Sequence, residues 1–447
     1  MAPNPGEAAG EDGCSPPRAA DHLTRHNLRV ESLFSLFNGV FMGMILFAAP
    51  VLAVTCLGAS RTELTVITCA FPCGAFLGPV WAMLGRRWGM QKLVLQMALW
   101  ANLPLFLMVW VDESVAFTAI ITASQLLHSA MRMGMSSMYR ATYPRPLLGR
   151  VLGWLTFCTF LTMVPTVLLA GWLSDASNDP TAYHYLFPAA GAFGLLACLF
   201  YARVRPAAGA PVTQRLATLR SGIRHVRRVV VSNRAYMFFQ LAFFLSGAAF
   251  FMSTHITLLL THDDLGFDAF QLALWLSVLP QVVLAVSSPG WGVVLDRIGI
   301  VRARLLISAV MTFYLACYFG GIALGVPGLM YIGSVLRGLS EGGGQVTWAM
   351  ASVHFAPKPE DVPLYNGIHF VLNGIRGLVM PWVGAELLFP YAREWTVFIA
   401  TLVSAASIFV IGYSLRYGHG PEPTPVVLQE DGDDLPGPTG QPTAEAG

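Results

Sequence analysis

Gly292-Val-Val-Leu-Asp296-Arg297-Ile-Gly299 is a charged turn between two long apolar stretches of the chain. The stretch before it covers residues 269–294, and the stretch after it covers residues 303–324. A helix needs about 20 predominantly apolar residues to cross the hydrocarbon core of a bilayer. Both stretches reach that length, so we expect two membrane-spanning helices with the charged turn at the membrane surface.

Apolar stretches of the same kind continue in both directions from this turn. We expect each of them to form a membrane-spanning helix, with bounds uncertain by a few residues. The twelve predicted spans are 32–54, 63–84, 91–110, 115–138, 149–174, 183–203, 235–260, 269–294, 303–324, 327–351, 362–388 and 394–416.

The composition of the chain agrees with a polytopic membrane protein. Of its 447 residues, 55% are hydrophobic and 12% are charged, whereas soluble domains carry roughly 25% charged residues. This excludes a cytosolic enzyme, a disordered scaffold and a secreted disulfide domain. A net charge of +2 with dispersed arginines argues against nucleic-acid binding. The seven cysteines show no CxxC or Cys/His spacing, so we expect no metal site and no cofactor.

The basic residues predict the orientation of the spans. Cytoplasmic loops are enriched in Lys and Arg. When the N-terminus is placed in the cytoplasm, only Arg61 and Arg393 of the 27 Lys and Arg residues fall in external loops, and Arg132, Arg337 and Arg376 fall within spans. We therefore expect a cell-membrane protein with both termini in the cytoplasm and an even number of spans.

The chain is expected to divide into five segments. Residues 1–30 form a cytoplasmic tail, 31–204 hold spans one to six, and 235–416 hold spans seven to twelve. Between the halves, 205–234 is a basic linker with apolar residues on one helical face, which predicts an amphipathic helix. The acidic segment 417–447 is rich in Pro and Gly and is expected to be disordered.

The two halves repeat each other at the start of their second spans. Leu57-Gly58-Ala59-Ser60 corresponds to Leu265-Gly266-Phe267-Asp268. Each is followed by a capping-box pattern, Ser60 with Glu63 and Asp268 with Gln271. At the other end of these spans, Arg87-Trp88-Gly89 corresponds to Arg297-Ile298-Gly299.

Six plus six spans, a basic central loop and paired short loops resemble the major facilitator superfamily of secondary transporters. The resemblance covers about residues 30–416, and its best motif is Gly292-x3-Asp296-Arg297-x-Gly299 with Arg302 and Arg304 behind it. It implies an all-α, twelve-helix fold of two pseudo-symmetric six-helix bundles around a central cavity. It also implies alternating access, in which the charged loop acts as a cytoplasmic latch.

The first-half copy of this loop departs from the family pattern. Ala82 stands where the resemblance would place Gly, and Arg86 stands where it would place Asp. Two adjacent arginines cannot form the same latch. The residues expected in the gating loops are Arg86, Arg87, Gly89, Gly292, Asp296, Arg297 and Gly299.

A small set of polar residues falls inside the spans, where ionisable groups are costly and usually mark a pathway or site. Spans 3, 6, 9 and 12 have no Lys, Arg, Asp or Glu in their interiors, as expected for the lipid-facing helices that the resemblance implies. The substrate or proton-coupling candidates are Asn38, His128, Arg132, Arg337, Glu341, Asn366, His369, Asn373 and Arg376.

These interior charges suggest an organic anion as the substrate. Three arginines stand against one acid, Glu341, and an unpaired buried guanidinium favours a carboxylate or phosphate. Glu341 is also the expected carrier of a co-transported proton, with His128 and His369 as second choices. The expected protein is a monomer that moves a small molecule across the lipid bilayer.

Structural alternatives exist for the same residues. Arg337 and Glu341, four residues apart, can form an intrahelical ion pair, or Arg376 can pair with Glu341. His128 can hydrogen-bond a neighbouring serine. His255 and Glu386 lie nearer the outer span ends and are interpreted as rim residues.

Two other functional classes compete with a transporter. A transporter-like sensor or structural protein without transport would share the fold. An intramembrane hydrolase is suggested by Gly338-Leu-Ser340-Glu-Gly342, which matches a nucleophile-elbow pattern. That pattern requires a strand–turn–helix context, and here it falls in an apolar helix.

Overall fold

The structure is a computed structural model. It describes residues 17–143, 145–176, 181–205, 229, 231, 233–356 and 362–416. Throughout these ranges the regular structure is helical, without strands. The helices form twelve long rods, some of them made of two or three consecutive elements.

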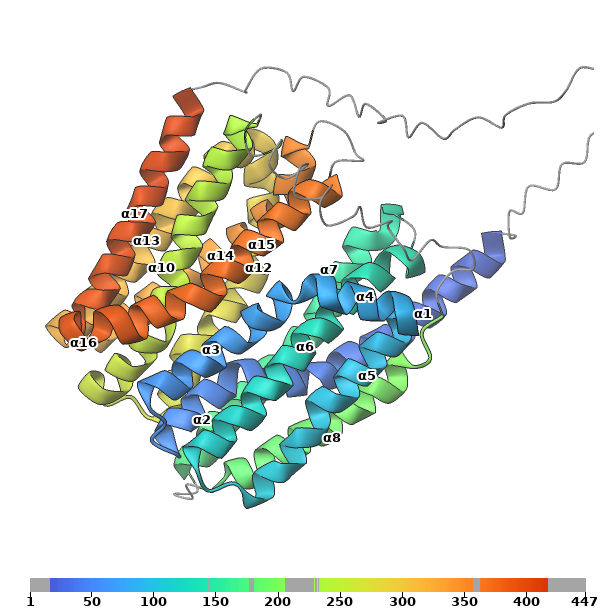
Figure 1. Cartoon of the computed structure of the whole chain (residues 1–447), viewed down its shortest axis with the longest axis horizontal. Coiled ribbons are helices and arrows are strands. Elements are labelled where there is room, and N and C mark those ends of the chain that lie inside the picture. Colours follow the sequence, from blue (N-terminus) through green and yellow to red (C-terminus); the bar gives the residue numbers. More distant parts are fainter. Residues whose placement is uncertain are drawn as a thin grey trace, which may run out of the picture.

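The first six rods make up the N-terminal half (Figure 1). Rods four, five and six are single helices, whereas the first three are interrupted. In chain order the elements are α1 Pro17–Met42, η1 Gly43–Ala48 and α2 Ala49–Thr55; α3 Arg61–Phe76 and α4 Gly78–Trp88; α5 Met90–Asn102 and η2 Leu103–Trp110; α6 Ser114–Thr142; α7 Arg145–Ala176; and α8 Tyr183–Tyr201.

The other six rods make up the C-terminal half. Rods eight and eleven are interrupted, and the other four are continuous. The elements are α10 Arg234–Leu265; α11 Ala269–Ala273, η3 Leu274–Val278 and α12 Leu279–Ile298; α13 Ile300–Leu324; α14 Pro327–Phe355; α15 Val362–Trp382, η5 Val383–Leu388 and α16 Phe389–Ala392; and α17 Trp395–Arg416.

Three of the interruptions have one cause. The segments η1, η3 and η5 are π-helical, and each is followed two residues later by a proline: Pro50, Pro280 and Pro390. A proline ring clashes with the carbonyl four residues earlier and has no N–H to donate. The helix widens to relieve the clash, which leaves carbonyl groups without helical donors.

The predicted repeat is confirmed at the level of backbone geometry. Both capping boxes form, Ser60 with Glu63 and Asp268 with Gln271. The glycines that the two halves share have positive φ: 57° at Gly58 and 67° at Gly266, then 89° at Gly89 and 77° at Gly299. A side chain would be strained at these φ values, so glycine is required at equivalent turns in both halves.

Helix packing repeats in the same order. In the N-terminal half α1 packs on α7 and α8, α6 packs on α3 and α5, and α5 packs on α8. The equivalent contacts in the C-terminal half are α10 on α15 and α17, α14 on α12 and α13, and α13 on α17. Each half is therefore a six-rod bundle with the same internal arrangement. In Figure 1 the two bundles approach each other where α3 and α16 lie and diverge toward the start of α1 and the end of α17.

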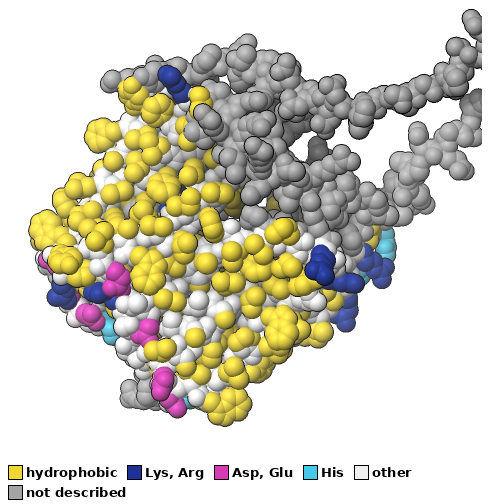
Figure 2. Space-filling view, viewed as in Figure 1, with side chains coloured by type: hydrophobic (Ala, Val, Ile, Leu, Met, Phe, Trp, Pro, Cys, Tyr) yellow, Lys and Arg dark blue, Asp and Glu magenta, His cyan; other side chains and the backbone are white. Residues whose placement is uncertain are grey.

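The surface is that of a membrane protein. Within the described residues, nine helices are long and apolar enough to cross a bilayer. The three rods outside this set are 61–88, 327–355 and 362–392. Large apolar side chains such as Trp100, Leu199, Phe313 and Phe409 are exposed, and Figure 2 shows apolar side chains covering much of one face, with acidic ones near the end where the bundles meet.

The predicted lipid-facing spans are among the less buried ones. Spans 3, 6, 9 and 12 are 39–44% buried, whereas the first and seventh spans are 72% and 67% buried. Of the nine helices found long and apolar enough to cross a bilayer, the fifth span, α7, is buried least, at 28%. It contacts the other half near its C-terminal end, at Gly171 and Asp175.

The structure also bears on the predicted tails and linker. Helix α1 begins at Pro17, inside the segment expected to be a tail. The tail residues before 17, most of the predicted amphipathic linker, and the acidic segment 417–447 lie outside the described residues.

Candidate functional site

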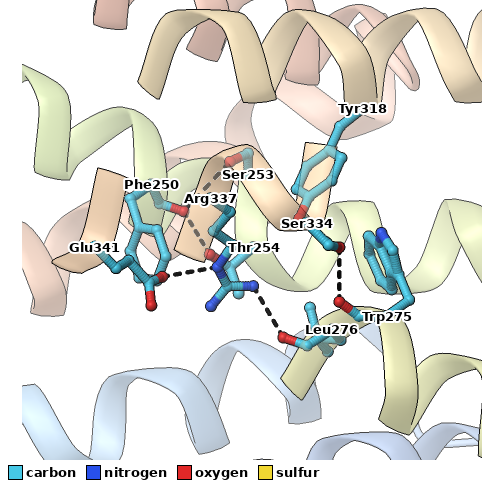
Figure 3. Close-up of polar contacts among 9 residues, drawn as sticks. All are labelled: Phe250, Ser253, Thr254, Trp275, Leu276, Tyr318, Ser334, Arg337 and Glu341. Carbon is cyan, nitrogen blue, oxygen red and sulfur yellow. Dashed lines mark hydrogen bonds and ion pairs between the residues drawn. The ribbon is translucent and has the colours of Figure 1, made fainter. Parts of the chain in front are cut away.

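Arg337 and Glu341 form an ion pair inside the C-terminal half (Figure 3). Arg337 Nε lies 2.7 Å from Glu341 Oε1, and the two side chains are 8% and 23% exposed. Both come from α14, one turn apart. The intrahelical pair is therefore present, and the alternative pair of Glu341 with Arg376 is absent from the described residues.

The kink in the eighth rod supplies the other partner of Arg337. Pro280 has no N–H, so the carbonyl oxygen of Leu276, four residues earlier, has no α-helical donor. Arg337 Nη1 donates to this oxygen at 3.2 Å. The carbonyl of Trp275, whose π-helical donor would also be residue 280, accepts from Ser334 Oγ at 2.7 Å. Helix α14 thus replaces the hydrogen bonds that the proline removes.

The remaining surroundings of Arg337 are aromatic and hydroxylic. Its Cζ lies 5.1 Å from the centroid of the Phe250 ring. A cavity of about 10 Å³ adjoins it, lined by α10, α13 and the π segment, which is space for about one water molecule. Ser253 and Thr254 face this cavity, and both hydroxyls donate to the carbonyl of Phe250. Arg337 lines this cavity, which has no space for an organic substrate in this conformation.

Arg376 lies elsewhere, about two turns nearer the N-terminal end of α10, at Phe243 rather than Phe250. Its Nη1 donates to the carbonyl of Phe243, and its Nε and Nη2 donate to Asn373 Oδ1 at 3.0 and 2.6 Å. Gly247 makes this approach possible, because a Cβ there would lie 2.0 Å from Arg376 Nη1. Arg376 is 7% exposed and has no carboxylate partner among the described residues.

Arg304 is a second buried cation at the same place. The sequence placed it with the cytoplasmic loop charges, but its exposed fraction is 4%. The guanidinium hydrogen-bonds Ser246 Oγ, and its Cζ lies 4.2 Å from the centroid of the Phe243 ring. Its position in the second turn of α13 points it into the bundle, because that helix buries Ala303, Arg304 and Ile307 on one side.

His369 joins this second cluster, and Asn366 is partly buried one turn before it on α15. The Nδ1 atom of His369 lies 2.9 Å from Gln240 Oε1, and the ring packs against Phe243 with centroids 4.7 Å apart. Four predicted residues therefore lie on α15. Asn373 accepts a hydrogen bond from Arg376, and His369 and Arg376 both contact the Phe243 ring.

The predicted residues of the N-terminal half form a separate group. Asn38 is buried on α1, and His128 is fully buried on α6, where neither ring nitrogen has a hydrogen-bond partner in the described part of the chain. The proposed serine bond of His128 is therefore absent among the described residues. Arg132 is exposed, with Nη1 3.6 Å from Met42 Sδ. Gln125 donates at 2.6 Å to Ile45, the carbonyl that would pair with Pro50 in π-helical register.

Glu31 is a buried acid that the sequence reasoning missed. It is 0% exposed, its Oε2 accepts from the Tyr143 hydroxyl at 2.9 Å, and its Oε1 has no partner among the described residues. The predicted first span begins at residue 32, so Glu31 falls one residue outside it. A signal was present: Glu31, Ser35 and Asn38 are spaced i, i+4, i+7 and share a helical face.

The two halves are joined by polar contacts at one end. Arg61 Nη2 lies 3.0 Å from Glu386 Oε2, and Thr62 donates to Glu386 Oε1 at 2.8 Å. Asp175 accepts from the backbone N–H groups of Ala269 and Phe270 at 3.1 and 2.6 Å, at the start of α11. An acid at a helix N-terminus is favoured by the unpaired N–H groups there.

His255 belongs to this junction. Its Nε2 lies 3.1 Å from Thr65 Oγ1 of the other half, and the two residues are 1% and 0% exposed. The interpretation of His255 as a rim residue is therefore wrong, because helix α3 packs over it. Glu386 is half-buried and pairs with Arg61. Deeper along the same contact, Cys69 Sγ donates to the Leu378 carbonyl at 3.4 Å.

The predicted gating loops lie at the opposite end. Gly89 and Gly299 form matching turns, as described above, and Gly292 lies on α12 with open space around it. Arg87, Asp296 and Arg297 are exposed. No ion pair of Asp296 is formed within the described residues, so the predicted latch is not closed there. The side chains of Ala82 and Arg86 lie outside the described set.

The hydrolase pattern around Ser340 lies in a continuous helix. Gly338 and Gly342 let α14 approach α12: a Cβ at Gly338 would lie 2.4 Å from the Pro280 carbonyl oxygen, and one at Gly342 would lie 2.4 Å from Ser287 Oγ. Ser340 is buried, with Oγ 3.4 Å from the Ile307 carbonyl. The pattern is therefore explained by helix packing, since Ser340 lies inside α14 and is not preceded by the strand and turn that a nucleophile elbow requires.

The sequence matches the Major Facilitator Superfamily over residues 32–319, which runs from the first rod into the ninth. Among curated proteins, no sequence matches the chain.

Solved structures of transporters share the fold. A mutant of the nucleoside transporter NupG superimposes with a TM-score of 0.69 at 11% identity, covering 88% of this chain and 99% of that chain. A D-xylose-proton symporter gives 0.66 at 12% identity, with 90% and 98% covered. The xylose transporter XylE from E. coli, in a partially occluded inward-open conformation, gives 0.64 at 12% identity, with 88% and 98% covered. At these identities the likeness concerns the fold.

Proposed function

Because the chain belongs to the major facilitator superfamily and is a multi-pass membrane transporter of that family, we propose that it moves a small organic anion across the cell membrane. The family and the fold support secondary transport of a small molecule and favour a transporter over an enzyme. The substrate class, the coupling ion and the orientation are the proposed parts.

The observation that carries the anion proposal is the charge balance of the bundle interiors. Glu341 neutralises Arg337, whereas Arg304 and Arg376 have no carboxylate partner within the described residues. A buried charge is strongly unfavourable unless it is paired and hydrogen-bonded. A carboxylate or phosphate on the substrate would supply the missing charge through bidentate hydrogen bonds, which guanidinium groups favour.

The contacts between the halves support an inward-facing state. In the described residues, the polar contacts that join the bundles involve Arg61, Thr62, Thr65, Cys69 and Asp175 of the first half. By the positive-inside rule, the helix ends that carry Arg61, at the start of α3, and Asp175, near the end of α7, lie on the external side of the membrane. Alternating access then requires these contacts to break and the cytoplasmic loops to close.

Proton coupling is proposed to act through Glu341. Protonation would remove its charge and release Arg337, whose other partner is the carbonyl of Leu276 at the kink of the eighth rod. Protonation of this one carboxyl group would thus alter the packing of α14 on α12. Glu31, buried without a cationic partner among the described residues, is the second acid able to carry a proton.

A transport assay with a substrate panel tests the anion proposal. Purified protein in liposomes would be given radiolabelled monocarboxylates, dicarboxylates, phosphate esters, neutral sugars, nucleosides and organic cations, with empty liposomes as the control. Uptake restricted to anionic compounds is expected. Uptake of cations alone would overturn the proposal, and binding without uptake of any compound would favour the transporter-like sensor.

A further inference from the structure

Two arginines contact the ring of one phenylalanine inside the C-terminal half. The Cζ atoms of Arg304 and Arg376 lie 4.2 and 4.7 Å from the centroid of the Phe243 ring. The three residues come from α13, α15 and α10, so the cluster joins three of the six rods of this bundle. Both arginines are more than nine-tenths buried.

The charges of this cluster are unbalanced. Its hydrogen-bond acceptors are neutral: Ser246 Oγ for Arg304, and the Phe243 carbonyl and Asn373 Oδ1 for Arg376. Both cations contact one ring, so they are at most roughly 9 Å apart, a distance at which buried like charges repel appreciably. Aromatic rings and neutral oxygens lower this repulsion only in part.

Several polar atoms of the cluster have no hydrogen-bond partner among the residues that the structure describes. These are Nε of Arg304, Nε2 of Gln240 and Nε2 of His369, all buried. The first two are donors, and the imidazole nitrogen becomes one when the ring is protonated. An unmade hydrogen bond of a buried donor is expensive, more so for a charged group. What the cluster lacks is an acceptor with negative charge.

We propose that Arg304 and Arg376, with Gln240 and His369, form the subsite for the carboxylate or phosphate group of the transported anion. The inference rests on the proposed function, because it assigns the site to the substrate. It is distinct from the Arg337–Glu341 pair, which is neutral overall and bonded to the kink of the eighth rod. A small free anion is favoured over a lipid headgroup because both guanidinium groups are buried inside the bundle.

Anion binding to the detergent-solubilised full-length protein tests the subsite. Inorganic phosphate and succinate would be titrated at constant ionic strength in a neutral detergent, and the thermal unfolding midpoint followed by tryptophan fluorescence. A ligand that binds the folded state raises this midpoint. We expect both anions to stabilise the wild type, and Arg304→Gln and Arg376→Gln to weaken their apparent affinity about tenfold or more.

Matched variants separate this effect from general changes of charge or folding. Arg302→Gln removes an exposed cation two residues from Arg304 on the same helix and is expected to leave anion affinity unchanged. Gly247→Ala keeps every charge but places a Cβ against Arg376 Nη1, so it should weaken binding as well. If Arg304→Gln proves unstable, Gly247→Ala still tests the site.

The outcomes distinguish the subsite from the transport proposal. Equal anion affinity in wild type, Arg304→Gln and Gly247→Ala would overturn the subsite, even if anions are transported. Loss of affinity in these variants, with no anion uptake by the wild type, would uphold an anion site while the transport proposal fails. Stabilisation by a short-chain phosphatidic acid but by neither free anion would assign the cluster to a lipid headgroup and overturn the proposal.

Discussion

Arg61 and Glu386 are 325 residues apart in the chain, and their side chains form an ion pair 3.0 Å long that joins the two bundles. Arg61 is the first residue of α3, and Glu386 lies in the π segment η5 of the eleventh rod. The only two basic residues predicted on the external side are Arg61 and Arg393, and both pair with acids of that end, Arg393 with Asp264.

These two ion pairs differ in one respect, which makes them a matched test of the external gate. By external gate we mean the contacts that hold the two bundles together at the external end. Arg61–Glu386 joins the halves, whereas Arg393–Asp264 lies within the C-terminal half. Glu386→Gln is expected to increase opening of the external end, and Asp264→Asn is not. Because the Arg61 and Glu386 side chains are each 31% exposed, the pair contributes at most about 1 kcal/mol, or roughly a fivefold change in population.

Labelling of Cys69 would measure this opening. Cys69 is buried at the contact between the halves, and a variant retaining only this cysteine would be exposed to a membrane-impermeant maleimide from outside. Faster labelling in Glu386→Gln than in Asp264→Asn is expected. Equal rates in both variants would show that the Arg61–Glu386 pair does not hold the gate.

Glu341→Gln tests the coupling residue. Without an ionisable group, pH-gradient-driven uptake should be abolished while substrate exchange across the membrane continues, because exchange needs no net proton transfer. Both would be measured in liposomes, with the exposed Glu113→Gln as the control. Preserved coupling in Glu341→Gln would redirect attention to Glu31, His128 and His369, or to sodium.

Arg337→Gln is expected to destabilise the protein strongly. It leaves Glu341 without its cation and the Leu276 carbonyl without its donor. Breaking a buried ion pair from one side typically lowers the free energy of unfolding by about 3–5 kcal/mol, so the thermal unfolding midpoint should fall by several degrees. Arg132→Gln, which removes an exposed arginine, should change it little. Similar midpoints for the two variants would contradict a structural role for the ion pair.

Ser340→Ala should leave transport and thermal stability nearly unchanged. Its hydroxyl makes one long hydrogen bond, 3.4 Å, to the Ile307 carbonyl, and alanine fits a position between two glycines that pack on α12. Uptake and unfolding would be compared with the wild type. Loss of a hydrolytic activity in this variant would revive the hydrolase alternative.

The fold was predictable because its signals are local. Span length, the capping patterns at Ser60 and Asp268, and glycines at equivalent turns each depend on a few neighbouring residues. The candidate residues were also found one helix at a time, since i, i+3 and i+4 spacing identifies a shared face. The same locality explains the omission of Glu31, which lay one residue outside a predicted span.

Contacts between residues of different helices could not be predicted from the sequence in this way. Arg304 sits among loop charges in the sequence, yet its position on α13 turns it toward Phe243 of α10. His255 is placed near a span end, yet α3 of the other half buries it. In both cases the deciding factor is which helix packs alongside, and no spacing within one helix contains that information.

The sequence by itself determined the number of spans, their repeat and the confinement of charge to a few interior positions, because transfer of each segment into a bilayer depends on its own composition. Only the tertiary structure decided how those charges are partnered. It bonded Arg337 to Glu341 and to a carbonyl that Pro280 leaves free, and it left Arg304 and Arg376 on one aromatic ring. Pairing requires side chains from separate helices to meet within hydrogen-bond distance, and that is set by the packing of the bundle.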